Sequence, residues 1–547
     1  MDSRVKEIVR VSDGLFADRR SRMDPYLQAV AENFYPERAE FTASTSNSGD
    51  WWDNLMSSEP VLKRRELANL IQSSMRPDSQ DWFTVRIIDD ELDKTNNVRR
   101  YLDWMTTVQR RAMYAASAQF SKSMKMMDHD WVAFGMGVVE IDVRRDMPSL
   151  AYRTHHLKDF AWTEDAYGAV ETPYRRWKPT AAQIVQMFPG KAHPLVEEAA
   201  KKEPLTRIAC CHVVMPRDKY EGSRKRSPKA NWISLHIDLE NETVLEETPM
   251  MWNKYVIPRW STVPGSQYAY SPAASVVLAD ARTLQSVWRV LLEAAEKAVD
   301  PPLVGTEEAL RSDISIYAGG ITMVESDYDE RSGAALRTLM TNPGAGIPYG
   351  LEMADRINSI LHHGFFLDKM SLPQPNREMT AYETQKRLEE HIRAATPLLT
   401  PAEDECNNPI CERTFEVLHA VNAFGPPDSV PQELQGQGIR YEFSSPIKDM
   451  RDGLEAMKLV EGVQMLAGLA QVDPIQMAWL DLDKASPEAL EASGVPARWV
   501  RDPKAFAAIR RQQERQQQLK AGMDAMQQTA ETARAAGPAL EQLGAGQ

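Results

Sequence analysis

The chain has 547 residues, of which 43% are hydrophobic and 26% are charged, as in a globular protein large enough to bury a core. The formal net charge of −14 argues against a protein that grips nucleic acid by its phosphates, because such proteins present a basic surface. The four cysteines match neither a secreted disulfide framework nor a two-knuckle zinc site, so we expect free thiols in a reducing compartment.

The sequence contains no signal for export or membrane insertion. Its N-terminal stretch "MDSRVKEIVRVSDGLFADRR" is charged throughout, and no run of about 18 apolar residues occurs anywhere. We therefore expect a protein that is neither exported nor membrane-spanning. An acidic protein can still handle DNA if its task is to let DNA pass without sticking.

Residues 1–270 predict a mixed region of helices and strands. Apolar residues at helical spacing predict helices over residues 1–45, 61–75 and 96–134. Alternating apolar residues predict strands in "DWFTVRI", "FGMGVVEIDVRR" and "YRTHHLKDFAWTED", and again between residues 207 and 259. Thr180 is placed to cap a short amphipathic helix.

The stretch from Ser271 to Pro302 predicts one long helix that ends at two prolines. Ser271 is placed to cap it and Pro272 to occupy its first turn, and some 28 residues would give a rod of about 42 Å. Apolar residues recur in alternating steps of four and three, which is the pattern of helices that pack along their length. This seam consists of Val277, Ala281, Leu284, Trp288, Leu291 and Ala295.

A second apolar edge follows the same helix, so we expect neighbours on two sides. This edge consists of Val276, Val287, Val290 and Ala294. Charged residues along the helix exclude a lipid environment. These are Asp280, Arg282, Arg289, Glu293, Glu296 and Lys297.

The second half of the chain predicts a small module and further helices. Residues 303–347 are punctuated by glycine and prone to form strands, and a helix over 348–366 and a loop with two prolines over 367–378 follow. A long helix comes next, up to about residue 425, and Pro397 and Pro401 should kink it. The C-terminal part predicts more helices, the last of them polar and rich in glutamine.

Motifs that carry catalysis are missing from the sequence. It contains no G-x-x-x-x-G-K-[ST] phosphate loop and no G-x-S-x-G elbow, so neither an ATP-driven motor nor a hydrolase of that class is expected. "GMGVVE" lacks the third glycine of a dinucleotide fingerprint, and we expect Gly135 and Gly137 to permit close strand packing instead. We predict no catalytic residue and no cofactor.

Candidate metal ligands have the wrong spacing. The two His–His pairs, at 155–156 and 362–363, are adjacent and should point to different faces, unlike the i, i+4 pairs of zinc-binding helices. The acidic stretch 327–333 carries Arg331 where a calcium loop needs a ligand, so we interpret it as a solvated turn. We predict no bound metal.

The order of these parts resembles the portal, or head-to-tail connector, of short-tailed bacteriophages. The resemblance covers nearly the whole chain and rests on seven phrases that occur in order, none of which is a catalytic signature. They are "LANLIQSSMRPDSQDWF", "FGMGVVEID", "EDAYGAVETPYRRWKPTAAQIVQMF", "YAYSPAASVVLADARTLQ", "REMTAYETQKRLEE", "LTPAEDECNNPICERTFEVL" and "ASGVPARWVRDPKAFAAIRRQQ".

The resemblance implies a mixed α+β fold, mainly α-helical, whose subunits form a ring of twelve around a central channel. Its parts are called wing, stem, clip and crown. Mapped onto this sequence they are the wing 1–270, the first stem helix 271–300, the clip 301–347, the second stem helix 348–366, the tunnel loop 367–378, the kinked helix with the return to the wing 379–445, the crown 446–502 and a C-terminal helix or barrel 503–547.

The resemblance also implies a non-enzymatic role at one capsid vertex of the virion, after assembly in the bacterial cytoplasm. Double-stranded DNA would pass through the ring, without sequence-specific contacts, during packaging, retention and ejection. The implied protein partners are the terminase large subunit and tail adaptor or nozzle proteins at the clip, and the major capsid and scaffolding proteins. No membrane is involved.

Four sets of residues are assigned to these contacts. The seam of the first stem helix is assigned to packing between subunits. A charged face of the stem is assigned to Asp280, Arg289, Glu293, Glu296 and Lys297. The tunnel loop is expected to project into the channel, where Lys369 or Arg377 would make weak, screened phosphate contacts; the alternative is a surface loop of the wing. The loop also contains Met370, Ser371, Leu372, Gln374 and Asn376, and docking at the clip is assigned to Glu325, Asp327, Asp329, Glu330 and Arg331.

The size of such a channel can be estimated from helix geometry. Twelve helices spaced about 10 Å apart make a circle about 38 Å in diameter. Subtracting a helix radius of about 5 Å on each side leaves roughly 28 Å, and a DNA duplex about 20 Å wide fits. Twelve copies would carry a formal charge of −168, so a lumen lined with carboxylates would repel phosphates.

Two other classes of protein remain open at this stage. A non-enzymatic intracellular helical scaffold or adaptor would explain the acidic charge and the missing active site, but not the seven phrases. It should purify as a monomer or dimer, whereas a portal should form rings with a central hole. A nuclease or packaging ATPase should show metal-binding carboxylates or a phosphate loop.

Overall fold

The computed structural model describes most of the chain up to residue 299 and shorter stretches beyond it. The chain divides into two compact units, one formed by residues 1–88 and 101–445 and the other by residues 89–100 and 446–547. Helices and strands are both present, as predicted. The described residues are 3–42, 55–78, 80–89, 96–144, 149–220, 230–299, 303–305, 336–338, 346–370, 390, 393–394, 396–426, 430–434, 436–444, 458–468, 479–482, 485–486, 489–490, 506, 508–513, 515–520 and 523.

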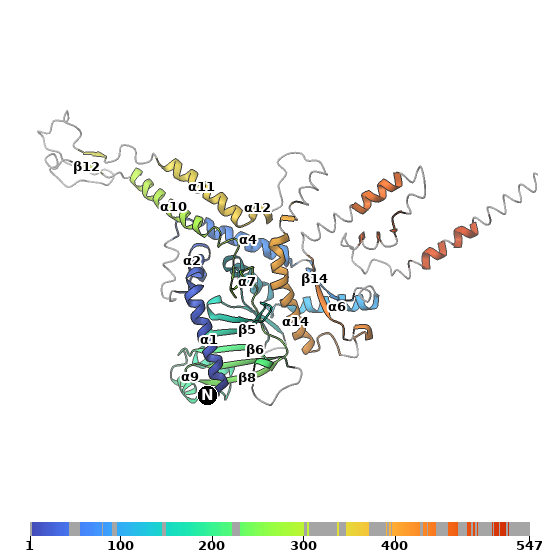
Figure 1. Cartoon of the computed structure of the whole chain (residues 1–547), viewed down its shortest axis with the longest axis horizontal. Helices are drawn as coiled ribbons and strands as arrows, with labels where there is room; N and C mark the ends of the chain where they lie inside the picture. The colour runs from blue at the N-terminus through green and yellow to red at the C-terminus, as the bar shows by residue number, and fades with distance from the viewer. Residues whose placement is uncertain are drawn as a thin grey trace, which may run out of the picture. The chain divides into compact units, whose positions relative to one another are not determined.

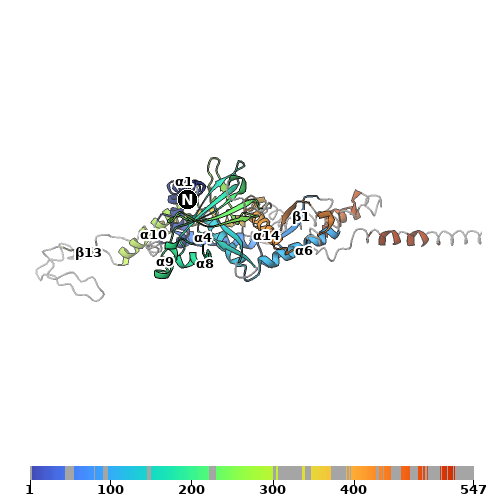
Figure 2. The same cartoon turned by 90° about the horizontal axis from the view of Figure 1, so that it is seen from below.

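The main sheet of the larger unit has five antiparallel strands, each paired with the one before it in the chain (Figure 1). They are β4 Phe160–Glu164, β5 Val170–Trp177, β6 Cys210–Pro216, β7 Trp232–Asp238 and β8 Thr243–Met250. Figure 2 shows helix α1, Ser3–Arg22, on one side of this sheet and helices α8, Ala181–Met187, and α9, Pro194–Lys202, on the other. The sheet is therefore buried on both faces.

The adjacent Cys210 and Cys211 illustrate this arrangement. Successive side chains of a strand point to opposite faces, and Cys211 lies in the apolar cluster with Val5 of α1, whereas Cys210 lies in the cluster with Ile184 of α8. All four cysteines are free, as predicted, and all four are buried. Burial raises the pKa of Cys211 to about 11 and that of Cys210 to about 12, so these thiols stay protonated.

Smaller sheets and helices complete the larger unit. Strand β1, Phe83–Ile87, pairs with β14, Ile439–Phe443, which ties together segments that lie far apart in the sequence. A second sheet has the order β3 Leu150–Thr154, β2 Val139–Val143 and β9 Tyr255–Val256, and β10 Ser261–Thr262 pairs with β11 Ala269–Tyr270. Three helices pack together, α2 Asp24–Phe34, α4 Glu59–Met75 and α7 Phe120–Phe134, and α6 is Asn96–Met113.

The predicted helix over residues 96–134 is two helices. Between α6 and α7 the chain turns, and Gln119 adopts a left-handed φ of 56° just before α7. Gly135 ends α7 with a φ of 74°, and a Cβ there would lie 2.1 Å from the backbone carbonyl carbon of Tyr270. Only glycine fits this close approach, so the prediction for Gly135 is confirmed, although the residue ends a helix.

The long helix of the second half departs from α-helical geometry just after Pro401. Residues 396–402 are helical, and the five residues Glu403–Asn407 then form a π-helix before α14, Asn408–Ala420. The prediction placed the irregularity at the prolines themselves. A π-helix was not predicted, because nothing in the local sequence distinguishes it from an ordinary helical turn.

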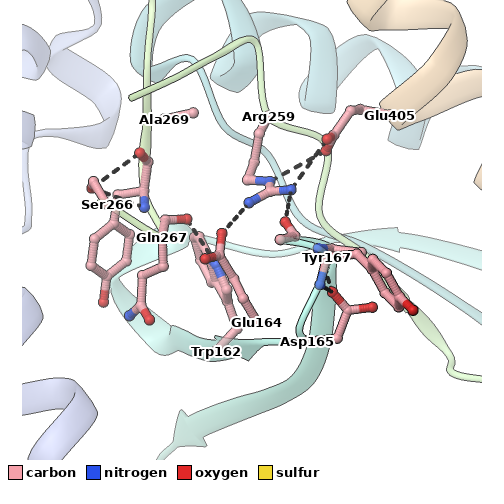
Figure 3. A network of polar contacts seen from close by, with 12 residues as sticks. Trp162, Glu164, Asp165, Tyr167, Arg259, Ser266, Gln267, Ala269 and Glu405 are labelled. Carbon is pink, nitrogen blue, oxygen red and sulfur yellow. Dashed lines mark hydrogen bonds and ion pairs between the residues drawn. The ribbon is translucent and has the colours of Figure 1, made fainter. Parts of the chain in front are cut away.

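Arg259 holds one side of the π-helix (Figure 3). This guanidinium, which is 5% exposed, donates to both carboxylate oxygens of Glu405 at 3.3 and 3.2 Å. It also donates to the carbonyl of Gly168 at 2.7 Å and pairs with Glu164 of β4. The helix is thereby linked to the edge of the main sheet.

Arg76 holds the other side of the π-helix. It follows α4, is 4% exposed, and donates to Asn407 Oδ1 at 2.6 Å. The same guanidinium forms an ion pair with Asp128 of α7, which is 2% exposed. Burial raises the pKa of Asp128 and the charge of Arg76 lowers it, so the carboxylate depends on this partner. Asn407 therefore joins α14 to the α4 and α7 pair.

His156 caps a single 3-10 turn, Leu157–Asp159, in its neutral form. Its Nδ1 accepts a hydrogen bond from Lys158 N at 3.1 Å, and its Nε2 lies 3.3 Å from the carbonyl oxygen of Arg38, so a single neutral tautomer satisfies both contacts. Burial, together with the charges of Arg38 and Lys158, lowers the pKa of His156 to about 3. Protonation would place a hydrogen on Nδ1, facing the Lys158 N–H.

His156→Asn is expected to make folding less sensitive to acid. Because the folded pKa lies below the unfolded value of about 6.5, the contribution of His156 is complete above pH 6.5 and is lost as the pH falls. At pH 5 that loss is about 2 kcal/mol, and asparagine keeps a cap acceptor that does not titrate. Urea unfolding at pH 7.5 and pH 5 measures how far the free energy of unfolding falls between the two pH values. An equal fall in the unaltered protein and in His156→Asn would contradict the prediction.

The smaller unit contributes helical stretches at residues 458–468, 508–513 and 515–520, where the sequence predicts helices. In the part of the chain that the structure describes, no helix combines the length and apolar character needed to cross a bilayer.

Candidate functional site, the two-helix stem

Helices α10, Leu278–Val299, and α11, Ile347–Gly364, lie side by side and run in opposite directions (Figure 1). We call this pair the stem. Helix α10 begins six residues later than predicted, and residues 272–277 before it form successive turns. Ser271 Oγ accepts a hydrogen bond from Ala274 N at 3.0 Å, the contact expected of a capping serine. With 22 residues the helix is about 33 Å long.

Two glycines of α11 fix the register of the stem. A Cβ at Gly350 would lie 2.4 Å from Leu291 Cδ2, and one at Gly364 would lie 2.2 Å from Val277 Cγ1. Gly350 and Gly364 are as far apart in the sequence as Val277 and Leu291. The earlier glycine meets the later residue, Leu291, and the later glycine meets the earlier residue, Val277. This is the register of antiparallel helices, and the missing side chains let α11 approach α10 closely.

Helix α11 carries the same seam as α10. Between its glycines, Ala354, Ile357 and Leu361 are buried, and their spacing continues the alternating steps of four and three. Ala281 and Leu284 are fully buried on α10 over the same stretch. The stem is therefore a pair of matched helical seams within one chain.

The seam assigned to packing between subunits lies at this contact within the chain. Val277, Ala281, Leu284 and Leu291 are buried, and Trp288 and Ala295 are half-buried. The sequence analysis did not compare this seam with the glycines of α11, which carry the matching pattern. Of the second apolar edge, Val276 and Val290 are exposed and Val287 and Ala294 are half-buried.

One side of the stem exposes apolar side chains on both helices. Each of these side chains comes from the residue just before a seam residue. Because the two helices run in opposite directions, the residues just before the seam lie on the same side of the pair in both helices. We call this set the apolar side. It consists of Val276 (69% exposed) in the turns just before α10, Val290 (64%) of α10, and Tyr349 (77%), Met353 and Ile360 of α11.

The opposite side of the stem is less apolar. It exposes Leu292 and Leu351, which follow the seam positions Leu291 and Gly350. Nearer the N-terminal end of α10, Gln285 occupies this side and accepts hydrogen bonds from the backbone N–H groups of Met56 and Ser57 at 2.7 and 2.8 Å. Residues of the same chain thus cover part of this side.

The stem contributes little to the net charge of the chain. Helix α10 carries three acidic and three basic residues, and five of the six are those predicted to form a charged face. Asp280 is half-buried and Arg289, Glu293, Glu296 and Lys297 are exposed or half-buried. Helix α11 carries Glu352, Asp355 and Arg356 and has a net charge of −1. The charge of −14 therefore resides elsewhere.

The chain reverses direction at the end of α11. Phe366 adopts a left-handed φ of 54°, and the short helix α12, Leu367–Met370, follows. His362 Nε2 lies 2.8 Å from an oxygen of Asp368, and His363 pairs with its other oxygen. We expected these adjacent histidines to diverge, but the reversal brings one carboxylate within reach of both.

Only part of the predicted tunnel loop lies within the described residues. Lys369 is exposed, with its Nζ 5.4 Å from the ring centre of Phe366, and Met370 is buried. Ser371, Leu372, Gln374, Asn376 and Arg377 lie outside the described residues, as do Glu325, Asp327, Asp329, Glu330 and Arg331 of the predicted clip. Within the clip, β12 Leu303–Gly305 pairs with β13 Leu336–Thr338. Among the residues that the structure describes, no three His, Cys, Asp or Glu side chains are placed to hold a metal ion.

Gly364→Ala is expected to destabilise the stem, and Val277→Ala should relieve the effect. The added methyl would overlap Val277 Cγ1, and overpacking of this kind costs about 1–3 kcal/mol. With alanine at position 277, the nearest remaining atom is Cβ at 3.5 Å, an ordinary contact. Thermal unfolding of both single variants and the double variant checks this. If the loss of stability in the double variant equals the sum of the losses in the two single variants, the register is contradicted.

Comparison with known proteins assigns a family to this arrangement. The family model for "Bacteriophage head to tail connecting protein" matches residues 7–500. The chain is 25% identical to a "Probable portal protein" of Bordetella phage BPP-1, covering 95% of this chain and 93% of that protein. It is 21% identical to a "Portal protein" of Salmonella phage epsilon15, covering 94% and 92%. The matched residues include the main sheet and both helices of the stem, and the chain therefore belongs to the family of bacteriophage head to tail connecting proteins.

Proposed function

We propose that the chain is the subunit of a portal ring of twelve copies at one capsid vertex. Double-stranded DNA passes through the ring during packaging, stays behind it in the filled capsid and leaves through it on ejection. The ring acts as a conduit and not as an enzyme. It assembles in the bacterial cytoplasm and remains in the virion.

The observation that carries this proposal is the apolar side of the stem. Its five exposed side chains extend along both helices, so water contacts several large apolar groups on this side, with Thr283 and Arg356 between them. Such groups mark surfaces that a partner covers. The internal seam of the stem is already filled by its own two helices, and a second copy of the chain offers a stem of the same length to cover them.

A ring requires that each stem present two different sides to its two neighbours. The apolar side supplies one surface, and the side with Leu292 and Leu351 supplies the other. These leucines and Val290 lie at the same height of the stem, since all three immediately precede or follow the contact between Leu291 and Gly350. Stems can therefore stack head to tail around an axis.

The remaining contacts of the proposal concern partners of the ring. The clip is proposed to dock the terminase large subunit during filling and tail adaptor or nozzle proteins afterwards. The wing is proposed to meet the major capsid and scaffolding proteins. Both assignments follow from the family and from the map of the sequence.

Deleting residues 369–376 is expected to leave ring assembly intact and to impair DNA retention. In the proposal this segment braces packaged DNA by weak contacts between cations and phosphates. Counting filled capsids after packaging, and again after a delay, measures retention directly. Retention equal to that of the unaltered protein would remove the tunnel-loop assignment.

The mass of the purified protein tests the proposal itself. The subunit has a mass of 61.8 kDa, and a ring of twelve copies has twelve times that mass. Analytical ultracentrifugation should show one species of that size. A stable monomer or dimer across the micromolar range would favour the adaptor interpretation instead.

A further inference from the structure

We infer that the main sheet forms a second contact between neighbouring subunits, in which the β4–β5 turn of one copy docks on residues that flank α8 and α9 of the next copy. This inference rests on the proposed ring. It places a contact outside the stem, and its partner is a second copy of the chain.

The β4–β5 turn presents an aromatic side chain to water. Tyr167 is 95% exposed, the largest exposed fraction of any large hydrophobic side chain that the structure describes. Figure 3 shows its ring pointing away from Arg259 and Glu405. A tyrosine buries a large area on binding and has few rotatable bonds to fix, so it is well suited to anchor a contact.

The backbone of this turn is held firmly, so the ring is already in position to dock. Asp165 Oδ1 accepts hydrogen bonds from the N–H groups of Tyr167 at 2.8 Å and Ala169 at 2.9 Å. Gly168 has a φ of 83°, and its carbonyl accepts the hydrogen bond from the buried Arg259 at 2.7 Å. Docking therefore costs little conformational entropy in the turn.

The turn also offers a negative charge beside the ring. The N–H groups of Ala169 and Tyr167 lower the pKa of Asp165, so this side chain is a carboxylate at neutral pH. Its Oδ2 makes no hydrogen bond or ion pair within the stretches of chain that the structure describes. A fitting partner surface combines an apolar side chain with cations.

Such a surface lies where the chain enters α8 and leaves α9. Thr180 and Arg207 form an antiparallel bridge, and Lys178, two residues before Thr180, shares their face of the paired segments. Leu205 lies at the same junction, because the carbonyl of the residue before it accepts a hydrogen bond from Ala182 N at 3.3 Å. We call Lys178, Leu205 and Arg207 the basic patch.

The basic patch is open to a partner. Leu205 is 81% exposed, and Lys178 and Arg207 are both exposed. Neither cation forms an ion pair with any residue in the described part of the chain. The patch therefore supplies one apolar group and two uncompensated positive charges.

The turn and the basic patch are chemically complementary. Tyr167 can pack on Leu205 with its ring face toward the guanidinium of Arg207, which is a cation–π contact. Asp165 can then pair with Lys178, because both groups lie beside their apolar neighbour.

The charge of the surrounding segments follows the same division. Residues 164–171 contain three acidic residues and no basic one. Residues 178–207 contain five basic and three acidic residues, a net charge of +2 in a chain whose net charge is −14. Segments of opposite charge attract each other and orient the two copies as they meet.

The positions of the two surfaces require two copies of the chain. Strand β5 has eight residues and lies between them, with the turn at its start and Lys178 directly after its end. Its length is about 26 Å, so the turn and the patch cannot meet within one subunit. Each copy presents a different surface at each end of the strand, which is the arrangement that head-to-tail contacts of a closed ring need.

Two exposed alanines allow a test that leaves the contact residues unchanged. Ala166 is next to Tyr167, and Ala182 lies beside Leu205. Rings of the Ala166→Cys, Ala182→Cys double variant would be treated with a short bis-maleimide and separated on a denaturing gel. All four native cysteines are buried, so the unsubstituted ring is the control for unspecific linking.

A ladder of linked subunits, from two up to twelve, is the expected result. The matched control is Ala166→Cys combined with Leu195→Cys. Leu195 is 61% exposed, but it lies at the start of α9, about 13 Å along that helix from the patch, so no ladder should form.

Double-variant rings that look normal in electron micrographs but stay unlinked would overturn the inference and leave the ring intact. If the double variant does not assemble, a cryo-EM map of the unsubstituted ring decides, because the inference requires Tyr167 of each subunit to contact Arg207 of the next. Absence of rings from the unsubstituted protein would instead overturn the proposed function.

Discussion

Val290→Asp is expected to abolish ring assembly and leave a folded subunit. Val290 is 64% exposed in the isolated chain and belongs to the apolar side of the stem, so an aspartate there costs little in the monomer. In the proposed ring it would place an unpaired carboxylate in every contact between stems, at a cost of several kcal/mol each. Because a closed ring repeats this cost at each interface, assembly should fail altogether.

Ser286→Asp is the matched control for this variant. It introduces the same charge one helical turn earlier on the same helix, at an exposed position that faces away from both neighbours. Sedimentation should show rings for Ser286→Asp and small species for Val290→Asp, with equal circular dichroism spectra. Rings of normal size from Val290→Asp would show that the apolar side is not an interface.

Arg76→Met is expected to destabilise the larger unit by about 3–5 kcal/mol, since it leaves Asp128 buried without its ion partner. The same change removes the hydrogen bond to Asn407 in the π-helix, so α14 loses its attachment to α4 and α7. Denaturant unfolding followed by tryptophan fluorescence measures the loss.

Two further variants make the measurement specific to the buried pair. Arg22→Met removes an arginine from an exposed pair with Asp18, and such pairs are worth about 1 kcal/mol or less. Adding Asp128→Leu to Arg76→Met should restore most of the stability, because no buried charge is then left unpaired. If Arg76→Met lowers the free energy of unfolding by no more than Arg22→Met does, the buried pair does not anchor the π-helix.

Much of the fold was predictable where the sequence pattern is local. The strands β1, β2, β3 and β4, the cap at Thr180 and the second stem helix follow from alternation, capping and periodicity of neighbouring residues. The family was predictable from phrases that occur in order, and the match over residues 7–500 confirms it.

Features that depend on distant partners were not predictable. Strand β14 pairs with β1 although most of the larger unit's sequence separates them, and the π-helix is held by two arginines from elsewhere in the chain. Local sequence propensity predicts none of these contacts.

The stem shows how a correct pattern can lead to a wrong partner. The seam of α10 was identified in the sequence, but its assignment to packing between subunits overlooked the glycines of α11. Gly350 and Gly364 are informative only when the two helices are aligned in reverse, with equal spacing in both. The second edge is exposed at Val276 and Val290, so it stays available for the second neighbour that the sequence led us to expect.

A cryo-EM cross-section through the assembled protein at the level of Val290 tests the central claim most directly. The account predicts a closed ring of twelve stems around a hole roughly 28 Å wide, with the apolar side of each stem against the next. Particles without a central hole, or a ring in which Val276, Val290 and Tyr349 face solvent, would contradict it.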